Sequence, residues 1–261
     1  MTVFLHELKR NRLMLGIWSA VTAFMLALCI FIYPEMQSEM DALNGMLENM
    51  GALSDAFGLD QLNFAEFMGY FGMECGEILG LGGSILAAIL GVNAIAGEER
   101  GGTAEFLFTH PLSKMRIVTE KMLSVAAMLV IMIASVAAVT TISVAVIDVD
   151  ADASELALLF LANLCLDIEI AAITLCLSSF IDKGGMGIGI GICFGLYFLN
   201  LIANITEAAE FLKFITPFGY TDGSYIVNEN AISIKYLSVG LVITVISIFV
   251  TYKKYLTKDI K

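Results

Sequence analysis

Two acidic residues, Asp167 and Glu169, stand in an apolar run that spans residues 156–181. A pair of carboxyl groups can act as acid and base, contact a cation, or hydrogen-bond a neighbouring helix. Near the middle of a membrane helix each charge costs about 2.5–3.5 kcal/mol, so something must offset it. Protonation, contact with water, or hydrogen bonds to hydroxyls such as those of Thr140, Thr141 or Ser143 would each offset this cost. Two steps along a helix turn by roughly 200°, so one wall cannot easily present both acids.

Two interpretations of Asp167 and Glu169 stay open. At least one carboxyl faces a transport path and contacts a cationic substrate, or both are polar contacts at a helix or subunit interface. A third interpretation, an intramembrane enzyme, has little support. The sequence contains no G-x-G-D or H-E-x-x-H motif, and its two histidines, His6 and His110, lie in predicted cytoplasmic segments.

Nucleotide-binding and metal-binding motifs are also missing. No G-x-x-x-x-G-K-[ST] loop is present, so this chain is predicted to be no ATPase and to bind no cofactor of its own. The five cysteines fall within or next to apolar runs and form neither a disulfide framework nor a metal-ligand pattern. Any chemical energy must then come from a partner chain, and no nucleic-acid partner is expected.

The composition of the chain predicts which structural elements hold Asp167, Glu169 and the other polar residues in place. The 261-residue chain is 58% hydrophobic and 15% charged, outside the range typical of soluble proteins. Apolar runs of roughly 20 residues are long enough to cross a bilayer as helices. We therefore predict an all-α polytopic membrane protein with one transmembrane domain, residues 1–261, and six spans at about 13–33, 78–97, 122–147, 156–181, 186–205 and 236–252.

The charges predict the orientation. All but Lys213 and Lys235 of the 14 basic residues fall in segments 1–12, 98–121, 182–185 and 253–261. Because Lys and Arg are retained on the cytoplasmic side, both termini are expected in the cytoplasm. The outer region 34–75 carries acidic residues and no Lys or Arg. It is either a solvated outer loop or a vestibule that attracts cations.

The fifth predicted span carries glycines at regular spacing. Gly187, Gly191 and Gly195 repeat every four residues, a small-xxx-small pattern that lets two helices approach closely. This pattern is compatible with a dimer interface and with packing inside one chain.

The predicted cytoplasmic loop 98–121 has the signals of a short helix. Thr103 can cap a helix through Phe108, His110-Pro111 breaks it, and Ser113 can cap the helix that enters the third span. Exposure of Phe106, Leu107 and Phe108 would invite a protein partner. Residues 2–12 read either as an interfacial helix or as a plain basic flank.

These residues carry a resemblance. The segments Gly102-Thr103-Ala104-Glu105-Phe106-Leu107, Pro111-Leu112-Ser113, Thr216-Pro217-Phe218-Gly219-Tyr220 and Tyr252-Lys253-Lys254-Tyr255 resemble the permease subunits of type-2 ATP-binding-cassette (ABC) exporters. The resemblance covers essentially the whole chain and does not indicate a substrate. It implies two six-span subunits that face each other in the plasma membrane of a prokaryote, as a homodimer or a heterodimer with a second permease.

The resemblance also implies roles for the cytoplasmic segments. Residues 2–12 would form an elbow helix, and residues 103–109 a coupling helix that docks on a separate ATPase, which binds ATP and Mg. The residues expected at that interface are Glu98, Glu99, Arg100, Thr103, Glu105, Phe106, Leu107 and Phe108. The acidic outer loops favour a cationic peptide or drug as the substrate. A non-transporting membrane anchor or immunity scaffold is the alternative function.

Overall fold

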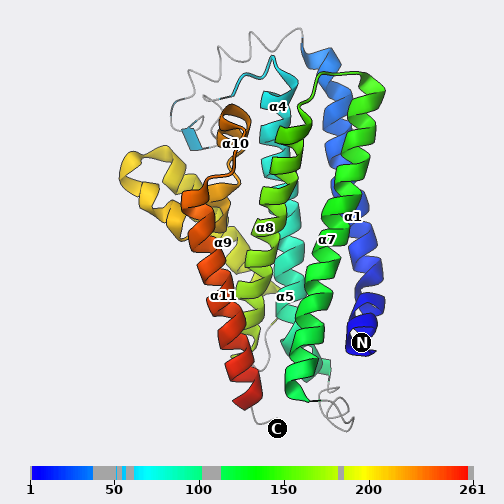
Figure 1. Ribbon diagram of the computed structural model, residues 1–261, viewed down its shortest axis with the longest axis vertical. Coiled ribbons are helices and arrows are strands. Elements are labelled where there is room, and N and C mark those ends of the chain that lie inside the picture. The colour runs from blue at the N-terminus through cyan, green and yellow to red at the C-terminus, as the bar shows by residue number, and fades with distance from the viewer. Residues whose placement is uncertain are drawn as a thin grey trace.

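The computed structural model describes residues 2–37, 51, 55–56, 62–101, 113–181 and 185–257. Within these ranges the fold is entirely helical, as predicted (Figure 1). The longest helices are α1 (Thr2–Met36), α5 (Gly82–Gly101), α7 (Lys114–Ile147), α8 (Ala153–Ser178), α9 (Met186–Ile205) and α11 (Ile234–Thr257). The shorter elements are α4 (Phe67–Glu74), the π-helix η3 (Cys75–Leu81), the 3-10 helices η4 (Glu207–Phe214) and η5 (Pro217–Tyr220), and α10 (Gly223–Glu229).

Among the described residues, six helices are long and apolar enough to cross a membrane, which confirms the predicted number of spans. The second of these is a composite, because α4, η3 and α5 follow one another without a break. Large apolar side chains cover the outward faces of the bundle, among them Phe24, Ile142, Phe198 and Phe249. An apolar exterior around a bundle of this kind is suited to lipid.

The helices pack in pairs around α8. Helix α8 lies near the centre of the bundle, α1 runs along α7 on one side, and α9 and α11 lie on the other (Figure 1). Helix α5 makes its largest contact with α8. The first residues of α1 and α7 and the last residues of α5 and α11 all lie at one end of the bundle, which is the end predicted to be cytoplasmic.

Local capping fixes where the central helices begin and end. The hydroxyl of Ser113 accepts a hydrogen bond from Arg116 N at 3.3 Å, so Ser113 caps α7 as predicted. The carboxylate of Asp152 caps α8 by accepting from Ser154 N at 2.7 Å. Asp148 adopts a left-handed conformation with φ 53° and ends α7. A short turn thus joins the two helices.

Several predicted boundaries differ from the structure. Residues 2–12 are the first turns of a continuous α1, so the predicted elbow is not a separate helix. The second helix begins at Phe67 rather than at residue 78, because Phe67 and Tyr70 pack on Tyr33 of α1 with ring centroids 5.3 Å away. Both ends of the predicted outer region 34–75 are therefore helical, the first as the end of α1 and the second as α4.

The remaining boundaries shift less. The predicted loop 98–121 gives its first residues to α5 and its last residues to α7. The fourth helix runs from Ala153 to Ser178 rather than over 156–181, and the sixth from Ile234 to Thr257 rather than over 236–252. The fifth helix, Met186–Ile205, has the predicted bounds.

Candidate functional site: buried carboxylates and a cytoplasmic clamp

The two acids of α8 point to different neighbours. Asp167 is fully buried against α5, where a Cβ atom on Gly83 would lie 2.7 Å from both of its carboxyl oxygens. Neither oxygen has a hydrogen-bond partner in the part of the chain that the structure describes. The glycine at position 83 therefore makes the room that the Asp167 carboxyl occupies. Such an unpaired buried carboxyl is a costly feature in a membrane bundle.

Glu169 faces the opposite side, as the helical geometry predicts. Its Oε2 accepts a hydrogen bond from Tyr220 Oη at 2.8 Å, and Gly240 of α11 lies directly against this pair. Tyr220 is 2% exposed, and burial, followed by the nearby Glu169 carboxylate, raises the pKa of its phenol. The hydroxyl therefore stays protonated and donates to Glu169.

The hydroxyls of α7 do not form hydrogen bonds to Asp167 or Glu169. Thr141 donates to Ala137 O at 2.8 Å and Ser143 to Val139 O at 2.9 Å, both within α7. Thr140 Oγ1 has no partner among the described residues. None of these three hydroxyls therefore bonds to either acid; Glu169 is bonded by Tyr220, which lies outside the six spans.

Two further acids lie in the second span and were missed by the sequence analysis. Glu77 Oε2 accepts from Tyr197 Oη of α9 at 2.7 Å, and Cys29 Sγ of α1 donates to Glu74 Oε2 at 3.4 Å. Both acids were assigned outside the span because the apolar run was counted from Ile78. The aromatic spacing of Phe67, Tyr70 and Phe71 was the signal that the helix begins earlier.

Polar groups of α8 pack directly against glycines of the second span. A Cβ on Gly80 would lie 3.4 Å from Asn163 Oδ1, and a Cβ on Gly91 would lie 2.6 Å from Ala171 O and still closer to Thr174 Oγ1. Together with Gly83, these positions let α8 place its polar side chains directly on the backbone of the second span. The seam between the second span and α8 is therefore closely packed.

A buried ion pair joins three helices at the predicted cytoplasmic end. Lys121 Nζ of α7 donates to Glu7 Oε1 of α1 at 2.7 Å and to Ala94 O of α5 at 2.7 Å. The Lys121 and Glu7 side chains are 1% and 4% exposed. The neighbouring Glu120 accepts from the first backbone amides of α1, Val3 N at 3.0 Å and Phe4 N at 3.2 Å. We call Glu7, Glu120 and Lys121 the cytoplasmic clamp.

The predicted ATPase-coupling residues adjoin this clamp in sequence. Glu98, Glu99 and Arg100 belong to the last turn of α5. The predicted coupling helix lies outside the described residues, with Thr103, Glu105, Phe106, Leu107 and Phe108. The described structure thus gives the two ends of the loop, at Gly101 and Ser113.

The glycines of α9 divide between two faces. A Cβ on Gly187, Gly191 or Gly195 would meet no atom within 4 Å, so this row faces away from the rest of the chain. Gly189 makes the close intramolecular contact instead, because a Cβ there would lie 2.9 Å from Ala88 O of α5. The predicted small-xxx-small row is left open in the described structure.

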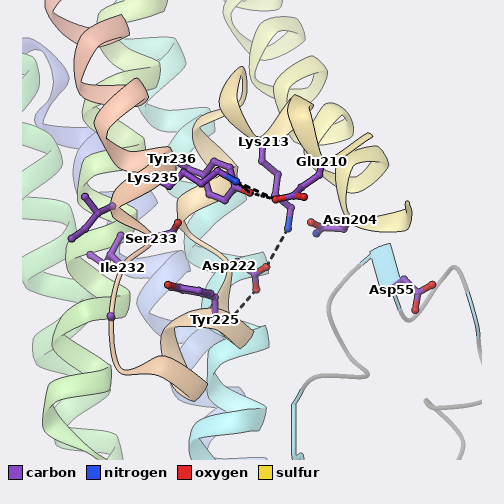
Figure 2. Close-up of a pocket in the computed structure, with 12 residues that line it drawn as sticks. Asp55, Asn204, Glu210, Lys213, Asp222, Tyr225, Ile232, Ser233, Lys235 and Tyr236 are labelled. Atoms are coloured by element: carbon purple, nitrogen blue, oxygen red, sulfur yellow. Dashed lines mark hydrogen bonds and ion pairs between the residues drawn. The ribbon is translucent and has the colours of Figure 1, made fainter. Parts of the chain in front are cut away.

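Two large pockets lie toward the other end of the bundle. The first, of about 630 Å³, is lined by residues of η4 and the start of α11, among others, and each of its two lysines lies next to a carboxylate (Figure 2). Tyr236 Oη donates to Glu210 Oε1 at 2.6 Å, and Lys235 Nζ lies 3.4 Å from the same oxygen. The hydrogen bond from Tyr236, helped by Lys235, lowers the pKa of Glu210. Lys213 Nζ lies 3.9 Å from Asp222 Oδ2.

The second pocket, of about 780 Å³, is acidic. Its lining includes Glu66, Asp148, Asp150, Asp152 and Glu155, and no Lys, Arg or His is among the described residues that line it. It lies beside the turn between α7 and α8, near the end of α1 and the start of α4. These residues combine part of the predicted acidic region 34–75 with the acidic turn that follows α7.

The six-span helical bundle, with no strand among its described residues, defines a polytopic membrane protein. The sequence matches the family model described as ABC-2 family transporter protein over residues 1–260, and the chain belongs to this family. It is thus the permease component of an ABC transporter, and not itself the ATPase. Members of the family generally work with an ATPase subunit. No curated protein matches the sequence.

Proposed function

We propose that this permease exports its substrate and is driven by a separate ATPase that docks on the loop 98–121. The cytoplasmic clamp is the observation that carries this proposal. In the first turns of α7, where the segment 98–121 ends, Lys121 holds α1 through Glu7 and α5 through Ala94 O. A force applied to the loop would therefore move three helices together, and would not simply bend the loop.

The proposed substrate is a cationic peptide or drug. The pocket of about 780 Å³ supports this choice, because its carboxylates would raise the local concentration of cations. In the assembled complex, cationic substrates should stimulate ATP hydrolysis. Asp150→Asn, which removes one exposed carboxylate of this pocket, should raise the substrate concentration needed for half-maximal stimulation and leave the basal rate unchanged. Equal stimulation of both proteins would reject the cationic substrate.

The proposed second permease, either the same chain or a different one, would cover the open glycine row of α9. A leucine at Gly191 would project from this row into open space in the single chain. We expect Gly191→Leu to convert a dimer into a monomer, measured by mass in detergent, without lowering the unfolding temperature of the chain. A dimer that survives this substitution would place the interface elsewhere.

The central experiment is capture of the ATPase. Replacing Phe106, Leu107 and Phe108 by alanine should abolish co-purification of the co-expressed ATPase. Phe211→Ala is the matched control, since Phe211 is an exposed aromatic residue of η4, outside the loop. Folding of both variants is checked by their unfolding temperatures. Normal capture by the triple variant would contradict docking on this loop.

A further inference from the structure

A third, small pocket lies between the π-helix η3, α9 and the segment that joins η5 to α10. Its volume is about 50 Å³, which is room for one or two water-sized groups. Oxygen-bearing side chains dominate its polar lining: Glu77, Tyr197, Asn200, Asn204, Thr221 and Asp222. We call it the Glu77 pocket. Single turns of π-helix such as η3 occur frequently at functional sites.

Two amide oxygens in this pocket are left without donors. Asn200 Oδ1 and Asn204 Oδ1 are buried atoms with no hydrogen-bond partner in the described part of the chain. The orientation of the Asn204 amide is fixed, because its Nδ2 donates to Ala56 O at 3.0 Å. Buried acceptors of this kind are normally satisfied by a bound donor, water or cation. The pocket therefore has room for a donor or a cation that the described part of the chain does not provide.

The charge of the pocket has one sign. Glu77 receives one hydrogen bond from Tyr197 Oη at 2.7 Å, which a neutral phenol donates without neutralising the carboxylate. Asp222 is already engaged, since its Oδ1 caps α10 by accepting from Ser224 N at 3.0 Å, and Lys213 lies beside its other oxygen. None of the described residues that line the pocket is Lys, Arg or His. Glu77 is therefore the carboxylate left for a bound cation.

Backbone packing makes the pocket narrow and rigid. A Cβ on Gly223 would collide with Gly72 O, so α4 and α10 approach through their glycines and leave no space to widen on that side. Gly76 also lines the pocket, but a Cβ there would meet no atom within 4 Å and would project into open space. Carboxylate and amide oxygens around a space of this size match a small, hard cation, and exclude a bulky organic one.

We propose that the Glu77 pocket binds one small monovalent cation, with Glu77 as its charge partner and the amide oxygens of Asn200 and Asn204 as ligands. The cation is either a metal ion such as Na⁺ or the primary ammonium group of a transported amine. Binding of a metal ion is independent of the proposed function, whereas the ammonium alternative rests on it.

The test uses the purified full-length chain in lipid nanodiscs without any ATPase. Its unfolding temperature is measured against NaCl, methylammonium chloride and tetramethylammonium chloride, at constant ionic strength maintained with choline chloride. We expect a saturable increase with Na⁺ or methylammonium and none with tetramethylammonium, which is too large for the pocket. Saturation by Na⁺ alone identifies a metal site, and saturation by methylammonium identifies an ammonium site.

Two variants localise the effect. Glu77→Gln should abolish the saturable increase, and Asn200→Leu, which removes one of the unpaired amide oxygens, should weaken binding at least tenfold. Glu210→Gln, an exposed carboxylate of the neighbouring pocket, is the control and should bind as the unaltered chain does. Isothermal titration of the unaltered chain should give one cation per chain.

The proposal is overturned if no small cation gives a saturable increase, if tetramethylammonium acts equally well, or if both pocket variants bind as tightly as the control. Because no ATPase is present, failure here leaves the capture experiment unaffected. Conversely, loss of ATPase capture by the loop variant would reject docking on the loop without touching a metal site at Glu77.

Discussion

Loss of the Lys121 ammonium tests the cytoplasmic clamp most directly. Lys121→Met keeps most of the side-chain length but removes the charge and the donors to Glu7 and Ala94 O. The Glu7 carboxylate would then remain buried, at 3% exposure, with Arg10 as its remaining ion-pair partner. Removing one member of a buried pair costs about 3–5 kcal/mol. Because Arg10 still neutralises Glu7 in part, we expect a loss of about 3 kcal/mol.

The double variant Glu7→Leu/Lys121→Met separates the charge from the packing. Replacing both members by apolar residues removes the unpaired carboxylate, so the stability should return to within about 1 kcal/mol of the unaltered chain. Under the proposed function this protein should still fold and capture the ATPase, but should export less substrate per ATP. The reason is that α7 and α1 would then be held together only by apolar contacts, which lack the defined geometry of an ion pair.

The assay is equilibrium unfolding of the purified chain in mixed micelles, followed by far-ultraviolet circular dichroism. Arg12→Met, a change at a neighbouring basic residue of α1, is the control and should be nearly neutral. A single Lys121→Met variant as stable as the unaltered chain would refute the energetic role of the ion pair. A double variant as unstable as the single one would show that packing, not charge, dominates.

Three further predictions concern other contacts. Gly91→Ala should destabilise the chain by about 1–3 kcal/mol, because its methyl group would be overpacked against α8. Gly187→Ala, whose methyl group would lie in open space, should be neutral or slightly stabilising. Both variants are measured by the same unfolding assay. Tyr220→Phe should cost about 1–3 kcal/mol, because Glu169 loses its donor, and Glu169→Gln/Tyr220→Phe should recover part of that loss. Glu210 has a lowered pKa in the folded chain, so its stabilising contribution is complete above the unfolded pKa and disappears as the pH falls through the folded pKa; Glu210→Gln should remove this part of the acid dependence of unfolding.

The features that repeat along the sequence were predictable. Six long apolar runs gave six spans, and the bounds of α9 agree because no charge interrupts that run. The cap at Ser113 followed from local hydrogen bonding. The separation of Asp167 and Glu169 followed from helical geometry alone. Each of these features depends only on residues that are close in the sequence, so the local sequence is sufficient to predict it.

The features that depend on distant partners were not predictable. The second span was expected to begin after Glu74 and Glu77, because acids mark the end of an apolar run. In the structure both acids lie within the second span, where Cys29 of α1 donates a hydrogen bond to Glu74 and Tyr197 of α9 donates one to Glu77. The same limit applies to Gly189, whose close contact with Ala88 O distinguishes it from its neighbours only after α9 has packed on α5.

The second span connects the two proposed sites. Its end that is predicted to be cytoplasmic is held by Lys121 at Ala94 O, its opposite part carries Glu77, and between them Gly83 and Gly91 pack it closely on α8. A closely packed helix shifts as a unit, so displacement of the loop by an ATPase would change the geometry of the Glu77 pocket. Thermodynamic linkage then requires reciprocity: if the docked ATPase alters the affinity for the cation by a given factor, the cation alters the affinity for the ATPase by the same factor. Equal factors, measured in both directions, would show that the clamp and the pocket belong to one coupled unit.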